Sequence, residues 1–175
     1  KNLSNAVRFL MAIGGSTNAV LHLPAIAAES GFGLPLTAID EISTATPCIA
    51  KFKPSSKYTL WDFFRAGGVG AVLSELTTLI DRDVSTVTGE KIERYFGAVK
   101  NRDIIRTLDT PLQPQGSIVV LRGNLAPDGA IIKVSGIRDA KSRHVGTAKT
   151  FDSEEDVMKH VMGKKVSPGD ILVIR

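Results

Sequence analysis

Residues 14–31, GGSTNAVLHLPAIAAESG, predict a tight turn followed by a mostly buried helix. The two leading glycines permit backbone conformations with positive φ and leave room for another group to approach. We expect Ser16 or Thr17 to cap the helix, because a hydroxyl there accepts a hydrogen bond from a backbone N–H two or three residues on. Gly31 stands where a C′ glycine would end the helix. The N–H groups and positive dipole end at residues 16–19 would suit a carboxylate or a phosphate, although the same pattern also fits a capped helix start that binds nothing.

The composition is that of an ordinary globular protein. The 175 residues are 43% hydrophobic and 23% charged, with a formal net charge of +4. The basic residues are spread out, and no apolar run approaches the roughly 20 residues that span a bilayer, so we expect neither a nucleic-acid nor a membrane partner. The single cysteine, Cys48, excludes an internal disulfide and a metal site built from cysteine alone. Its apolar neighbours favour a buried, inert thiol over a cluster ligand.

Two further helices are predicted on either side of this central stretch. Apolar residues recur at three- and four-residue steps over residues 3–13, with Asn5 and Arg8 on the opposite, polar face. A short helix is expected over residues 36–42, with Thr37 as its cap.

A short strand is expected over residues 47–52, and it leads to a loop over residues 53–57. Lys53 and Ser55 in this loop carry a cation and a hydroxyl, which together suit an anion contact. The alternative is a solvated turn, since loops are polar for solvation alone.

A capping pattern then opens another helical region. Thr59 and Asp62 have the spacing of a capping box, with Asp in the usual place of Glu. A glycine-rich break over residues 66–70 separates this helix from a second one predicted over residues 71–80. The aromatic residues of the first helix are expected to pack in the core or against another domain; they are Trp61, Phe63 and Phe64.

The helical pattern of the first 80 residues does not continue in the second half of the sequence. Residues 81–116 hold a short helix at 91–96 and little apolar periodicity, and we interpret them as a linker. Residues 117–175 then read as strands around one helix, the predicted strands being 117–121, 130–134, 149–151 and 171–174, with the helix over 154–162. The continuous apolar run of the first strand predicts burial on both faces, and residues 123–129 form the expected hairpin loop.

The sequence contains few motifs that indicate a specific catalytic or binding chemistry. The sequence lacks the Gly-x-Ser-x-Gly elbow, the phosphate-binding Gly-x-x-x-x-Gly-Lys-Ser/Thr loop and the dinucleotide-binding Gly-x-Gly-x-x-Gly pattern. Its three histidines lack metal-ligand spacing; His22 is expected in the core and His160 as a cation at a helix end. Residue patterns alone therefore indicate a soluble α/β protein and no particular activity.

Six segments, in the same order and with similar gaps, resemble one family, that of dihydroxy-acid dehydratase and its sugar-acid (phosphogluconate) dehydratase relatives. They are residues 14–23, 53–58, 65–68, 121–130, 151–155 and 168–175. The chain starts without Met and ends within an apolar run, so we expect it to be an internal piece of such a polypeptide.

The resemblance implies an iron–sulfur, Mg²⁺-dependent lyase that removes water from a 2,3-dihydroxy acid and yields a 2-keto acid. It implies a cytoplasmic homodimer, or an organellar one in a eukaryote. Its fold would be α/β, with a cluster-bearing N-terminal α/β domain joined by a linker to a β-barrel-like C-terminal domain. Residues 1–80 would be the last helices of the first domain, residues 81–116 the linker, and residues 117–175 the first strands and helix of the second.

The same resemblance implies that the ligands of the cluster and of Mg²⁺, and the catalytic base, lie outside this chain. The chain would then contribute substrate-binding residues only. The expected set is Ser16, Thr17 and Asn18 at the helix start, with Lys53 and Ser55 as weaker candidates. A sugar-acid dehydratase and a non-catalytic binding domain of the same fold remain open as alternatives.

Overall fold

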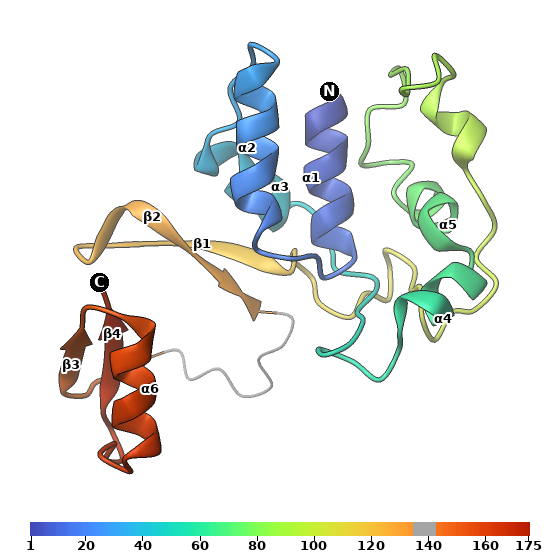
Figure 1. Ribbon diagram of the computed structural model, residues 1–175. Coiled ribbons are helices and arrows are strands. Elements are labelled where there is room, and N and C mark those ends of the chain that lie inside the picture. Colours follow the sequence, from blue (N-terminus) through green and yellow to red (C-terminus); the bar gives the residue numbers. More distant parts are fainter. Residues whose placement is uncertain (135–142) are drawn as a thin grey trace. The chain divides into compact units, whose positions relative to one another are not determined.

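The computed structural model describes residues 1–134 and 143–175, which fall into two compact units, Lys1–Ile137 and Arg138–Arg175 (Figure 1). The elements of the first unit are α1 (Asn2–Ala12), α2 (Ala19–Glu29), α3 (Leu36–Thr44), α4 (Leu60–Arg65), α5 (Gly68–Glu75), the 3-10 helix η1 (Ile92–Tyr95), β1 (Ile118–Gly123) and β2 (Ala126–Lys133). The second unit contains β3 (Ala148–Phe151), α6 (Glu154–Met162) and β4 (Ile171–Ile174).

Helix α1 is the central element of the first unit, and its prediction from apolar periodicity is confirmed. Val7 and Met11 pack into one hydrophobic cluster with residues of α3 and β1, while Ala12 packs into a second cluster built around α5. Asn5, which was predicted on the polar face of this helix, is buried, and its amide is hydrogen-bonded to the backbone of Asp81.

Helix α2 ends as expected but is far more exposed than expected. Gly31 has φ +76°, and the N–H groups of Gly31 and Phe32 donate to the carbonyls of Ala28 and Ala27 at 3.0 and 2.8 Å, which is a Schellman motif. The buried residues of α2 are Val20 and Ala27. The prediction of a buried helix, and of His22 in the core, is therefore wrong. The sequence of α2 is apolar on nearly every side, but the helix packs against the rest of the unit along one narrow stripe.

The segment that follows α2 departs from prediction at two points. Pro35, and not Thr37, is the N-cap residue of α3. Residues 47–52 run as a loop with an isolated bridge between Cys48 and Gln113, where a strand was predicted. The reason is that the N–H groups of Ile49 and Ala50 both donate to the carbonyl of Ala12, at 2.8 and 3.0 Å.

Helices α4 and α5 confirm the local sequence signals. Thr59 and Asp62 form the expected capping box, and the chain turns sharply where Gly67 has φ +120°. Helix α5 starts earlier than the predicted range and ends at Glu75. Of the three aromatic residues of α4, Phe63 is in the core as expected, and Trp61 and Phe64 are exposed. Their packing against another domain stays a prediction.

Residues 81–116 have little regular structure, as expected, yet they are packed against the helices. Ile104 and Ile105 are buried in the same cluster as Leu76, and the Arg106 N–H donates to the Ile49 carbonyl at 2.9 Å. The division of the chain at residues 80 and 116 stays a prediction.

Strands β1 and β2 form the expected antiparallel hairpin, in which Ile118 pairs with Lys133. The loop between them is shorter than predicted, because β2 begins at Ala126. Ile118 and Val120 of β1 are buried, whereas Leu121 is exposed. The prediction of burial on both faces is therefore wrong: Ile118 and Val120 share one face of the strand, whereas Val119 on the other face is only half-buried.

The second unit is a β3–α6–β4 unit with a parallel pairing of Ala148 with Ile171 through Phe151 with Ile174. Ser153 caps α6 by accepting a hydrogen bond from the N–H of Asp156. Within residues 1–134 and 143–175 the strands form two two-stranded sheets and no closed barrel. The α/β character holds, and the barrel-like form of the C-terminal domain is taken up below as a proposal.

Candidate functional site

The candidate site is the corner where α1 ends and the chain turns toward α2. Gly14 adopts φ +64°, which favours glycine. The Gly15 N–H donates to the Leu10 carbonyl at 3.0 Å, and a Cβ at Gly15 would collide with the Leu10 side chain. The corner is thus a close backbone approach that a larger residue would disrupt.

Ser16, Thr17 and Asn18 form a hydrogen-bonded turn ahead of α2. The Ser16 hydroxyl accepts from the Asn18 N–H at 3.2 Å, and the carbonyls of Ser16 and Thr17 accept from Ala19 at 3.2 Å and Val20 at 3.0 Å. Asn18 is the N-cap residue of α2. The expectation that Ser16 or Thr17 occupies the cap position is therefore wrong, because the tight turn places the helix start one or two residues later.

This turn determines which backbone N–H groups are free to donate a hydrogen bond to an anion. The N–H groups of residues 18–20 are already used inside the turn. Across the described parts of the chain, the N–H groups of Ser16 and Thr17 and the Thr17 hydroxyl form no hydrogen bond. Ser16 and Asn18 are exposed and Thr17 is half-buried. The hydrogen-bond donors open to an anion therefore lie in residues 16–18, directly before the first residue of α2.

The loop around Lys53 and Ser55 is held by its neighbours. The Lys53 N–H donates to the Tyr58 carbonyl at 2.7 Å, and the Ser55 N–H to the Phe52 carbonyl at 2.9 Å. Ser56, which the sequence did not single out, donates from its hydroxyl to the Lys51 carbonyl at 2.7 Å. The Lys53 side chain is exposed and Ser55 is half-buried.

The two groups of candidate residues are connected only through the end of α1, as far as the described residues show. Ala12 lies two residues before Gly14 and accepts from Ile49 and Ala50, which precede the Lys53 loop. No hydrogen bond in residues 1–134 and 143–175 joins the loop directly to the turn of residues 16–18. Binding of one ligand by both groups stays a prediction.

Cys48 lies beneath this corner as an inert thiol. Burial raises the pKa of Cys48, and the opposing influences are smaller: the charges of Lys51 and Lys133 and the backbone groups of Ala50 and Gly14. The sequence had not singled out Lys51 or Lys133. Lys133 is brought here by long-range pairing, since it faces Ile118 in the hairpin and the Ser117 N–H donates to the Met11 carbonyl at 3.4 Å. The charges of Lys51 and Lys133 are therefore close enough to act on Cys48, which lies near Gly14.

The described residues do not fit a metal centre on their own. Within residues 1–134 and 143–175, no three His, Cys, Asp or Glu side chains are grouped closely enough to hold a metal ion. Among the helices of those residues, none has both the length and the apolar character needed to span a bilayer.

Comparison with known proteins identifies the class. The family model described as "Dihydroxy-acid/6-phosphogluconate dehydratase N-terminal" matches residues 1–95, and its "C-terminal" counterpart matches residues 103–175. The chain belongs to the dihydroxy-acid/6-phosphogluconate dehydratase family, which confirms the resemblance seen in the sequence motifs.

Three similar curated relatives share one name. Proteins named dihydroxy-acid dehydratase are 45% identical in Ignicoccus hospitalis, 42% in Methanococcoides burtonii and 46% in Solidesulfovibrio magneticus, each over the whole of this chain. The match covers 32%, 33% and 32% of those relatives. The chain thus spans about a third of the length of the relatives that it matches.

Proposed function

We propose that this chain is part of a hydro-lyase that converts a 2,3-dihydroxy acid into a 2-keto acid, the reaction of a dihydroxy-acid dehydratase in branched-chain amino acid biosynthesis. The observation that carries the proposal is that N- and C-terminal family models both match this one chain, alongside relatives of that name at 41–46% identity.

Within that enzyme, the turn of residues 16–18 would bind the carboxylate of the substrate. The Ser16 and Thr17 N–H groups and the Thr17 hydroxyl are donors, and hydrogen bonds from such donors to an ionised acid are stronger than bonds between neutral groups. The nearby charges of Lys51 and Lys133 favour an anion at the corner. Lys53 and Ser55 are second candidates for the other end of the acid.

The cofactors of the proposed enzyme are an iron–sulfur cluster and Mg²⁺, which would supply Lewis-acid assistance to loss of the hydroxyl. The family resemblance assigns their ligands to sequence outside residues 1–175. The β-barrel-like C-terminal domain, the homodimer and the cytoplasmic (or organellar) location belong to the same proposal.

A second candidate is a sugar-acid dehydratase acting on 6-phosphogluconate, because the matching family models cover both reactions in their description. The complete polypeptide should be assayed for 2-keto acid formation from a branched-chain 2,3-dihydroxy acid and from 6-phosphogluconate. Turnover of the branched-chain acid alone supports the first proposal. Turnover of phosphogluconate alone supports the second, and turnover of neither supports a non-catalytic binding domain.

Substitution of Thr17 by Val tests the binding role of the turn. Loss of one hydrogen bond to a charged group costs about 1.5–3 kcal/mol, so KM for the acid is expected to rise roughly 10- to 100-fold. Thr37→Val is the matched control, since Thr37 is an exposed threonine at the start of α3 that Pro35 caps. If both variants fold normally and both change KM equally and only slightly, the turn does not bind the substrate.

A further inference from the structure

Helix α4 presents aromatic side chains to solvent. Trp61 is 65% exposed and Phe64 is 66% exposed, and their rings stack with centroids 5.3 Å apart. Val69, at the start of α5, is 53% exposed and lines the same hollow as Phe64. We call these three residues the α4 surface. Large apolar side chains that are contiguous on a protein surface mark an interaction site more often than single ones do.

The α4 surface is held rigidly in this exposed position. The capping box of Thr59 fixes the start of α4, and Phe63 anchors its inner face in the core. The rings of Trp61 and Phe64 therefore stay outside because the helix is fixed by other residues.

A hollow of about 740 Å³ adjoins this surface, between the α4–α5 turn and residues 97–100. Gly67, Gly68 and Gly97 contribute to its lining, so much of the wall is backbone. The Gly97 N–H donates to the Gly70 carbonyl at 3.0 Å and the Lys100 N–H to the Ala66 carbonyl at 2.8 Å, which ties the two segments together. A preformed hollow of this kind can accept an inserted side chain without rearrangement.

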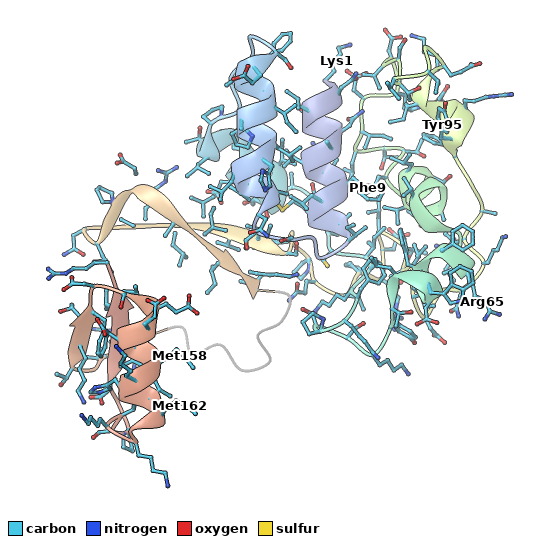
Figure 2. The ribbon with its side chains drawn as sticks, in the orientation of Figure 1. Lys1, Phe9, Arg65, Tyr95, Met158 and Met162 are labelled. Atoms are coloured by element: carbon cyan, nitrogen blue, oxygen red, sulfur yellow. The ribbon has the colours of Figure 1, made fainter. Side chains whose placement is uncertain are left out.

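The charge around the hollow is positive. Arg65 and Lys100 both line it and are exposed; Arg65 is labelled on α4 in Figure 2. In the described part of the chain, neither side chain takes part in an ion pair. A partner suited to this site therefore combines an apolar side chain for the α4 surface with a carboxylate for the two cations.

We propose that the α4 surface and its hollow dock an acidic, apolar segment of the same longer polypeptide, outside residues 1–175. The matched relatives are about three times as long as this chain, so a polypeptide of that length has further sequence that could cover this surface. Docking of a second copy through the same surface is disfavoured, because a two-fold interface would bring together the Arg65 and Lys100 side chains of both copies, and no described residue that lines the hollow is a carboxylate. The inference depends on family membership and not on the proposed lyase reaction.

Phe64→Asp in the complete polypeptide tests this docking. A docked Phe64 would bury a charge, and the unfolding temperature should fall by roughly 5 °C or more. Val87→Asp is the matched control, since Val87 is fully exposed in the segment before η1. Similar, small shifts for both variants would show that the surface is free and would overturn the proposal.

Sedimentation of the same variant separates the two possible occupants. Intramolecular docking predicts that the Phe64→Asp protein keeps the oligomeric state of the parent. Dissociation of an oligomer, with an unfolding temperature that depends on protein concentration, would assign the surface to a second copy and would also overturn the proposal.

Trp61 fluorescence provides a test that needs no disruptive variant. The difference between the parent and Trp61→Phe spectra isolates the emission of this residue. We expect it to be blue-shifted and protected from iodide in the folded polypeptide, and to become quenchable on unfolding. Red-shifted, freely quenched emission in the folded protein would contradict docking. None of these readouts involves catalysis, so failure of the lyase proposal would leave them unaffected.

Discussion

Asn5 is a buried polar side chain of α1 that forms two hydrogen bonds to a distant part of the chain. Its Nδ2 donates to the Asp81 carbonyl at 2.7 Å and its Oδ1 accepts from the Asp81 N–H at 2.9 Å. The amide therefore satisfies both backbone groups of a residue 76 positions away. This pair of bonds ties the segment after α5 to the first turns of α1.

Substitution of Asn5 by Ala should therefore destabilise the protein. The change leaves the N–H and the carbonyl of Asp81 without their partner, and the free energy of unfolding should fall by about 1–3 kcal/mol. Asn2→Ala is a control on the same helix, because Asn2 is exposed and makes one hydrogen bond, to the Ser85 carbonyl at 3.1 Å. Denaturant unfolding measures both, and equal losses would show that the Asn5 bonds add nothing.

At the scale of the element, the capping box of α4 stabilises the start of the helix through two side chains, the Thr59 hydroxyl and the Asp62 carboxylate. The Thr59 hydroxyl accepts from the Asp62 N–H at 3.2 Å, while the Asp62 carboxylate accepts from the Thr59 N–H at 2.7 Å. The Thr59 backbone N–H, followed by the Thr59 hydroxyl, holds the pKa of the Asp62 carboxyl below its ordinary value. A depressed pKa means that Asp62 contributes stability above its unfolded pKa of about 4, and that this contribution is lost as the pH falls through the folded pKa.

Two variants separate these contributions. Thr59→Ala should lower the free energy of unfolding by about 1 kcal/mol, the usual cost of a lost N-cap. Asp62→Asn should lower stability at neutral pH and make the loss of stability on acidification smaller than in the parent. Unfolding curves recorded from neutral pH to below pH 4 check both, and parallel pH profiles for the parent and Asp62→Asn would contradict the assignment.

At the scale of the whole molecule, the family resemblance implies that the ligands of the cluster and of Mg²⁺ lie outside residues 1–175. The chain also spans about a third of the length of each relative that it matches. We therefore expect the isolated 175-residue segment to form no 2-keto acid from a branched-chain dihydroxy acid, even with added iron, sulfide and Mg²⁺. The complete polypeptide is the positive control in the same assay. Turnover by the segment alone would show that the reaction centre lies within it.

The sequence by itself determined the features that depend on neighbouring residues. The Thr59–Asp62 cap, the Gly31 helix end and the hairpin of residues 118–133 follow from local spacing, turn geometry and capping chemistry. The family assignment was also available from the sequence, since it rests on the order of six short motifs.

Only the tertiary structure decided which face of each element is covered. Asn5 is buried and Trp61 is exposed, the reverse of what their polarity indicates. Lys133 reaches the Gly14 corner through strand pairing with residues far away in the chain. Burial and charge at a site depend on which distant segment packs there, and the period of a helix or strand carries no information about that partner.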